Sequence, residues 1–237
     1  IYMNAYSEKY NYLIRWNGKS GCSYFRQLFL YLHESELKKK PKNKWHDLNI
    51  DFPLPKEIAL KKVTKLVLVR NPYERVVSMF CNKYCGGEGH NLLSKKMKIE
   101  KCTFRHFVYK LRDLKNNNKL NNYDIHIREQ AYNCKIDDKT TIIKLESFNK
   151  SIKNIYRKNK NLRELLPKVL IFFSNDDKIV TNKTTRTQNI CKAFDIEYSV
   201  DHKVFPTWKA FYNKDIKLIV DKIYKSDFLL FNYPTKI

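Results

Sequence analysis

"VTKLVLVRNPYERVVSMF" spans residues 63–80 and joins a continuous apolar run to an amphipathic segment. The run of β-branched residues and leucines that ends at Val69 is typical of a strand buried on both faces of a parallel sheet. Pro72 follows it closely and suits the first turn of a helix. One apolar stripe at helical spacing then comprises Tyr73, Val76, Val77, Phe80 and Tyr84. This stretch therefore predicts a buried strand followed by a helix.

The same alternation continues on both sides of this stretch. Residues 10–16 and 140–145 predict two more strands. Apolar residues at helical spacing begin at Phe25 and recur in 103–113, in 149–166 and from Ile216 to Ile223, which predicts a helix in each of these segments. The 237 residues contain no internal repeat and no Pro/Gly/Ser-rich linker. We predict a single α/β domain, 1–237, with a central parallel sheet flanked by helices.

Composition narrows the functional classes. Hydrophobic residues make up 43% of the chain and aromatic residues 14%, which excludes a chain disordered throughout. No stretch of about 18 apolar residues is present, so we expect no membrane span. The net charge of +23 favours an anionic partner, either a nucleic acid, a polyanionic glycan, a nucleotide or a membrane surface. A solvated, lysine-rich surface explains the charge about equally well.

The six cysteines do not form the pattern of a disulfide scaffold in a chain of this length. "CNKYC" (81–85), followed by His90 and Cys102, resembles a zinc site only loosely, since no paired CxxC or HxxxH accompanies it. We predict one structural disulfide or buried thiols, and no metal. Cysteine usage leaves the compartment open.

A glycine-containing turn follows the strand predicted at 10–16. "WNGKSGCSYF" (16–25) contains Gly18, Lys19 and Gly21 just before an apolar, helix-spaced run. In parallel α/β sheets ligands bind beyond the carboxyl ends of the strands, and the N–H groups of a helix N-terminus favour an anion. The turn therefore predicts an anion site, with a plain helix-capping turn as the alternative. It is not a Walker motif, because Leu13 stands where that motif has glycine.

Two motifs together resemble a known family. "KSGCSYF" (19–25) and "RNPYERVVSMF" (70–80) resemble the two cofactor signatures of sulfotransferases that use 3′-phosphoadenosine 5′-phosphosulfate (PAPS). The Gly-Cys-Ser variant is most similar to the carbohydrate, Golgi-type family 2 branch, with Gly18 in place of its usual proline. The resemblance implies a P-loop-like sulfotransferase fold. It also implies that the 5′-phosphosulfate is bound by Lys19, Ser20, Gly21, Cys22, Ser23 and Tyr24, and the 3′-phosphate by Arg70 and Ser78.

The resemblance continues along the chain. "NYDIHIREQAYNC" (122–134) is similar to a family segment that has histidine, glutamine and cysteine where this chain has His126, Gln130 and Cys134. Glu129 replaces a proline that is frequent in the family. "TNKTTR" resembles a late loop near the nucleotide, which adds Lys183 to the cofactor residues, and "IYKSDFLLFNY" (223–233) is similar to the family's tail. No resemblance covers 35–60 and 85–122, which we expect to shape the acceptor site.

The mechanism implied by the resemblance is in-line transfer of a sulfuryl group from PAPS, with PAP (the desulfated cofactor) as product. Lys19 would stabilise the leaving phosphate, and His126 would act as general base on the acceptor hydroxyl. The expected acceptor is a carbohydrate hydroxyl, on a neutral or an already anionic glycan. No metal is required.

Three other interpretations compete with this one. The main alternative is a basic nucleic-acid or polyanion-binding domain without catalysis, which the charge and the aromatic content would suit. A small-molecule kinase and a catalytically inactive glycan-binding relative are the others. The expected location is the Golgi lumen for a membrane-anchored eukaryotic enzyme, or the cytoplasm for a microbial or viral one.

Overall fold

The computed structural model describes residues 3–33, 63–85, 103–132, 134–174, 185–187, 192–198 and 204–236, excepting the side chains of Met3, Cys22, Ser23 and 185–187. Residues group into two compact units. The first comprises Ile1–Arg70 and Lys135–Thr181, and the second Asn71–Cys134 and Asn182–Ile237. The prediction that residues 1–237 form one domain stays a prediction.

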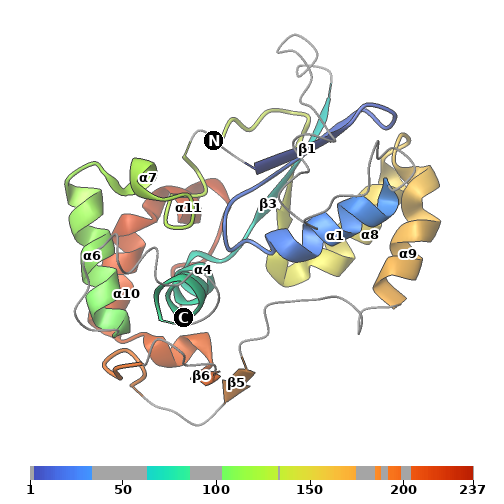
Figure 1. The fold of residues 1–237 in the computed structure, drawn as a ribbon. Helices are drawn as coiled ribbons and strands as arrows, with labels where there is room; N and C mark the ends of the chain where they lie inside the picture. The colour runs from blue at the N-terminus through green and yellow to red at the C-terminus, as the bar shows by residue number, and fades with distance from the viewer. Residues whose placement is uncertain are drawn as a thin grey trace. The chain divides into compact units, whose positions relative to one another are not determined.

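The first unit is built on a four-stranded, mostly parallel sheet of order β1-β2-β3-β4 (Figure 1). Its strands are β1 (Met3–Ser7), β2 (Tyr12–Trp16), β3 (Thr64–Val69) and β4 (Thr140–Lys144). β3 pairs in parallel with β2 on one side and with β4 on the other, with Leu66 opposite both Ile14 and Thr141. The strands predicted at 10–16, 63–70 and 140–145 are thus confirmed, as is their parallel arrangement.

The N-terminal strand β1 was not among the predicted elements. It pairs antiparallel with β2 through a tight turn in which Asn11 has a left-handed φ of 49° and donates its N–H to the Glu8 carbonyl at 3.1 Å. The sequence "MNAYS" shows neither β-branched residues nor an apolar run. Pairing with β2, rather than local propensity, therefore makes this segment a strand.

Three helices cover one face of this sheet: α1 (Cys22–Leu32), α8 (Phe148–Lys158) and α9 (Leu166–Ser174) (Figure 1). The core between them takes alternate residues from the strands and one apolar stripe from each helix. It includes Tyr12, Ile14, Trp16, Leu66, Leu68, Ile143, Phe25, Phe29, Ile152 and Val169. Val67 and Val69 of β3 are buried too, which confirms the predicted two-sided burial of that strand. The α/β class, with helices flanking a mostly parallel sheet, is confirmed.

The second unit is mainly helical. It contains α4 (Pro72–Met79), a π-helical turn (Phe80–Tyr84), α6 (Phe104–Asn116), α7 (Leu120–Tyr123), α10 (Lys214–Ile223) and α11 (Lys225–Leu230). Strands β5 (Thr185–Thr187) and β6 (Val204–Pro206) form a short parallel pair. The helices predicted in 72–84, 103–113 and 216–223 are confirmed. Their apolar stripes meet in an aromatic cluster in which Phe80 contacts Phe104, Phe107 and Phe211.

Short 3₁₀ segments lie between several of these elements. Leu145–Ser147 links β4 to α8, Arg163–Leu165 precedes α9, and Trp208–Phe211 precedes α10. Helix starts are fixed by side chains that the sequence supplies at the right place: Asn71 accepts from the Tyr73 N–H at 2.9 Å, and Thr103 accepts from the His106 N–H at 3.1 Å. The first of these caps fixes the start of α4 at Pro72.

Candidate active site

The turn after β2 has an unusual backbone. Lys19 and Gly21 both have left-handed φ angles, of 68° and 80°, and the Ser20 N–H between them donates to the Asn17 carbonyl at 3.4 Å. A left-handed φ is rare for a residue other than glycine, and such strain is concentrated at functional sites. The backbone therefore reverses tightly at Lys19 before α1 begins.

Helix α1 begins in a form suited to an anion. Gly21 is its N-cap and no side chain caps it, and its first turn holds no acidic residue. The N–H groups of a first helical turn have no intrahelical carbonyl to bond, and the helix dipole adds partial positive charge there. The turn predicted as an anion site thus has the backbone geometry of one, and the Lys19 ammonium adds a full charge.

Gly21 is required by the space around it as well as by its φ. A Cβ at this position would lie 2.4 Å from Cδ1 of Leu145, the first residue after β4. Its φ of 80° would strain any L-residue with a side chain. The glycine therefore lets the turn sit directly against the end of β4.

Arg70 joins the second motif to this turn. Because β2 and β3 are neighbours and Trp16 lies opposite Leu68, the residue after β3 emerges beside the turn that follows β2. The Arg70 Nη1 donates to the Lys19 carbonyl at 3.4 Å, and both residues are partly buried. The first unit thus brings together Lys19, Gly21 and Arg70, a set of donors and cations that fits the phosphates of a nucleotide.

Ser20 in this turn and Tyr24 in the first turn of α1 are buried to different degrees. Ser20 is completely buried in the turn. The Tyr24 ring packs edge-on against Phe148 and Phe172, with ring centroids 5.3 and 5.7 Å away. The Tyr24 side chain therefore belongs to the core, which leaves its backbone N–H as the group that could serve an anion. The side chains of Cys22 and Ser23 lie outside the described part, as does Lys183.

Ser78 lies in the second unit, on α4. It is partly exposed, while Tyr73, Val76 and Val77 of the same helix are buried. This confirms that its hydroxyl lies off the apolar stripe, as the spacing predicted.

His126 forms a pair with Asp124. Asp124 Oδ1 accepts the His126 backbone N–H at 2.8 Å and lies 2.8 Å from His126 Nδ1, and both side chains are about a quarter exposed, at 27% and 26%. An ionised carboxylate requires hydrogen on Nδ1, which leaves Nε2 as the basic nitrogen. Sequence reasoning missed Asp124. The signal was available, because an aspartate two residues before another residue often accepts that residue's N–H in an Asx turn.

A buried polar network holds the His126 segment. The Arg75 Nη2 donates to the His126 carbonyl at 3.0 Å, and its Nη1 lies 4.0 Å from Asp227 Oδ2. Asp227 also accepts the Ala131 N–H at 2.7 Å and the Gln130 amide at 3.4 Å. Arg75, Gln130 and Asp227 are buried. Helix α4 and the C-terminal segment therefore position the base candidate together.

Glu129 anchors the same segment from the other side. Its carboxylate accepts from Lys115 Nζ at 2.6 Å and from the Asn121 amide at 2.8 Å, and its N–H donates to Asn121 Oδ1 at 2.9 Å. Glu129 therefore ties the local turn to Lys115 of α6 and Asn121 of α7.

A model of the Sulfotransferase family matches residues 6–234, nearly the whole chain. The chain belongs to the sulfotransferase family, in its family 2 branch. It is a PAPS-dependent enzyme that transfers a sulfuryl group from this nucleotide donor to a hydroxyl acceptor. Neither the comparison with curated proteins nor the comparison with solved structures gives a match.

The cysteines of this sulfotransferase differ in state. Cys85 is disulfide-bonded, as expected for one structural disulfide, while Cys81 and Cys134 do not take part in a disulfide. In the described ranges no three His, Cys, Asp or Glu side chains gather as metal ligands. No helix within those ranges has the length and apolar character to span a bilayer.

Replacing Gly21 by alanine tests the turn. We expect Gly21→Ala to lower the free energy of unfolding by about 1–3 kcal/mol, because the left-handed φ is costly with a Cβ. Chemical denaturation measures it. A Leu145→Ala background is the control, since it removes the side-chain contact and leaves the backbone cost. Full rescue in that background would show that the φ of Gly21 carries no cost.

The buried Asp227 predicts a pH effect on stability. Burial raises the pKa of its carboxyl to about 6, against the opposing effect of Arg75. The unfolded chain has a pKa near 3.9, so the folded sulfotransferase binds the extra proton between about pH 4 and 6. Asp227 therefore stabilises the fold more as the pH falls through this window, by up to about 3 kcal/mol.

The measurement compares wild type with Asp227→Asn, which keeps an acceptor for the Ala131 N–H and does not titrate. We expect the stability of wild type relative to the variant to fall from pH 4 to pH 7 and to stay level above it. A relative stability that rises with pH would mean that the Arg75 guanidinium outweighs burial.

Proposed function

We propose that this sulfotransferase transfers the sulfuryl group of PAPS to a carbohydrate hydroxyl, with Lys19 stabilising the leaving phosphate and His126 as general base. The observation that carries the nucleotide part of the proposal is the hydrogen bond from Arg70 to the Lys19 carbonyl. It links the two cofactor motifs, which are about fifty residues apart in sequence, at one edge of the sheet.

Different residues around the turn would bind the two phosphate groups of PAPS. The backbone N–H groups of 21–24 and the hydroxyls of Ser20 and Ser23 would bind the 5′-phosphate, since the uncapped start of α1 favours an anion. Arg70 and Ser78 would bind the 3′-phosphate, which ADP and ATP lack. Bound PAPS supplies the activated sulfuryl group. Lys183 is proposed as a further nucleotide contact from the resemblance alone.

Lys19 and His126 would have different chemical roles in the transfer. The ammonium of Lys19 would stabilise negative charge on the departing phosphate oxygen, which is the usual task of cations at such sites. The Nε2 of His126 would take the proton of the acceptor hydroxyl as its oxygen attacks. Asp124 would keep the Nδ1 hydrogen in place and stabilise the resulting imidazolium, as a positioning residue.

The acceptor class is argued from charge. A net charge of +23 is far more than a nucleotide requires, and it favours an acceptor that carries negative charge along its length. A polyanion-binding domain without catalysis explains the charge equally, but it gives no reason for the paired cofactor motifs. In this proposal, attraction of polyanions serves the capture of the acceptor glycan.

Nucleotide binding gives the first test. We expect PAP to bind with micromolar or better affinity by calorimetry, and ADP, ATP and a DNA oligomer to bind much more weakly. Arg70→Ala removes a charge-assisted hydrogen bond and should weaken PAP about 10- to 100-fold. Arg157→Ala on the exposed side of α8 is the charge-matched control and should change little. PAP binding no tighter than that of ADP would refute the assignment of Arg70.

Kinetics test the histidine pair. His126→Ala should lower kcat by about 10²–10⁴-fold, the range of general base catalysis, with PAP affinity unchanged. Asp124→Asn should lower kcat by a smaller factor, again with PAP affinity and acceptor KM unchanged, because it disturbs only the tautomer and orientation of His126. The exposed Asp138→Asn serves as control. A loss confined to KM would assign Asp124 to acceptor binding instead.

A further inference from the structure

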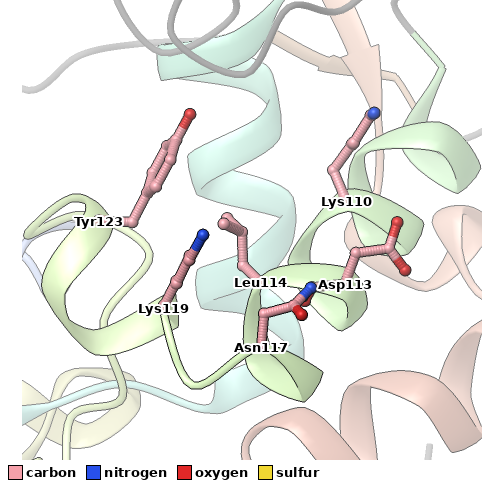
Figure 2. A pocket seen from close by; sticks show the side chains of 6 residues that line it. All are labelled: Lys110, Asp113, Leu114, Asn117, Lys119 and Tyr123. Atoms are coloured by element: carbon pink, nitrogen blue, oxygen red, sulfur yellow. The ribbon is translucent and has the colours of Figure 1, made fainter.

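Two cavities border helix α6 within the second unit. One, of about 290 Å³, is lined by Lys110, Asp113, Leu114, Asn117, Lys119 and Tyr123 (Figure 2). The other, of about 580 Å³, is lined by Arg112, Lys115, Asn116, Ile219, Lys222 and Ile223, from α6 and α10. The two cavities use different sides of α6, because residues three or four apart share a face of a helix. The larger volume is well within the range for small-ligand pockets.

The two cavities differ in chemistry. Figure 2 shows Lys110 and Asp113 on one side of the smaller cavity and Tyr123 on the other, so that cavity combines both charges with an aromatic ring. The described lining of the α6–α10 cavity has three cations, one amide and two isoleucines, with neither an acid nor an aromatic ring. It therefore offers a sugar ring no stacking surface and its hydroxyl groups few partners. Positive charge beside aliphatic side chains fits an anion that carries an aliphatic chain.

The three cations keep donors available for a ligand. Lys222 is exposed and forms no ion pair or hydrogen bond with the described residues. Lys115 donates to Glu129 at 2.6 Å, but an ammonium has several N–H groups, so others are left. The Nε and Nη2 of Arg112 both donate to Asp113 at 3.3 Å, which leaves Nη1 for a ligand. Donors of this kind bind phosphate and carboxylate groups.

The ends of the two helices do not cancel this charge. The described lining residues lie in the C-terminal halves of α6 and α10, where carbonyl oxygens without intrahelical partners would carry partial negative charge. At the end of α6, the carbonyls of 113–115 accept backbone N–H groups from 117–119. At the end of α10, the Val220 carbonyl accepts the Tyr224 N–H at 3.0 Å. With these carbonyls bonded, the side-chain cations dominate the local field.

The apolar part of the lining reaches the surface of α10. Ile223 is almost completely buried, whereas Ile219 is partly exposed. Leu218, next to Ile219 and one helical turn before Lys222, is 48% exposed. Exposed apolar side chains beside cations are typical of surfaces that contact lipids, and basic pockets bind lipid head groups. The chemistry of the cavity and of the surface beside it thus agree.

We propose that the α6–α10 cavity binds an anionic lipid. The acid head group, a phosphate or a carboxylate, is bound by Arg112, Lys115 and Lys222, and the first part of the aliphatic chain packs on Ile219 and Ile223. The proposal does not depend on the proposed carbohydrate acceptor, because no lining residue is assigned to the donor, the base or the acceptor.

The experiment measures binding of octyl phosphate by calorimetry, below the concentration at which it forms micelles. Inorganic phosphate and octanol are the comparison ligands, since each carries one of the two chemical features. The test variant is Arg112→Gln with Lys222→Gln, which leaves the pair of Lys115 and Glu129 in place. The matched control is Lys214→Gln with Lys225→Gln, which removes the same charge from exposed positions that do not line the cavity.

We expect octyl phosphate to bind wild type at least about tenfold more tightly than inorganic phosphate or octanol. The test variant should weaken octyl phosphate about tenfold, because it removes charge-assisted hydrogen bonds, and the control should change it less than about threefold. Equal losses in the two variants would show general attraction of anions and would overturn the proposal. Equal affinities of wild type for octyl phosphate and inorganic phosphate would overturn it too.

The aliphatic contact has a variant of its own. Ile219→Ser should weaken octyl phosphate about three- to tenfold and leave the affinity for inorganic phosphate unchanged, because it removes apolar surface and no charge. Leu229→Ser is the control, since Leu229 is 71% exposed and does not line the cavity. Thermal melting verifies that each variant is folded. Unchanged binding of octyl phosphate to a folded Ile219→Ser variant would contradict the proposed chain contact.

Vesicles distinguish a lipid presented by a membrane from a free one. Binding to phosphatidylcholine vesicles that contain phosphatidate, lost without phosphatidate and in the test variant, would support a membrane lipid. Binding of octyl phosphate or octanoate without binding to either vesicle would support a free anionic lipid. PAP affinity should be equal in wild type and in all these variants, because none of the changed residues belongs to the proposed nucleotide site.

Discussion

The parallel pairing of β2 with β3 is the constraint on which the nucleotide site depends. The register that sets Ile14 opposite Leu66 also brings the two strand ends, at Trp16 and Val69, to the same edge of the sheet. Parallel strands require a long crossover, so these ends come from segments about fifty residues apart in sequence. Hydrophobic burial fixes the register, because a slip of one residue would turn Tyr12, Ile14 and Trp16 away from the core. The positions of Lys19 and Arg70 thus follow from core packing in the strands that precede them.

Within the second unit, the buried charge pair of Arg75 and Asp227 holds the His126 segment in position. Arg75 and Asp227 are almost completely buried, and such pairs often contribute little net stability because desolvating both charges is costly. What they provide here is geometry. Arg75 donates to the His126 carbonyl and Asp227 accepts from the backbone of Ala131, so the segment between them is held at both ends. The network explains why polar groups occupy positions that apolar residues could fill.

The elements that could be predicted from the sequence are those whose signal is local. The apolar run that ends at Val69 and the apolar stripe of α4 can be recognised from residues that are adjacent or one helical turn apart. Strand β1 lacks such a signal, since "MNAYS" becomes a strand only through pairing with β2. The same limit applies to the site. Ser78 could be placed on α4 from its spacing, but the ties of Asp227 to Gln130 and Ala131 join residues nearly a hundred positions apart. No local pattern in the sequence indicates contacts between residues so far apart along the chain.

Glu129 stands where the resemblance described above would place a proline, and it supports the local turn through contacts with side chains instead. Proline restricts the unfolded chain, and so it favours a turn through entropy without requiring a partner. Glu129 restricts nothing in the unfolded chain and must gain its effect from partners in the folded state. It has them in Lys115 of α6 and Asn121 of α7, which bind one carboxylate oxygen. Its other oxygen is buried with no hydrogen-bond partner in the described residues, a desolvation cost that proline would not carry. The turn that presents His126 is therefore coupled to α6 and α7. Where proline would make this turn independent of its surroundings, Glu129 makes the geometry of the His126 segment depend on α6 and α7.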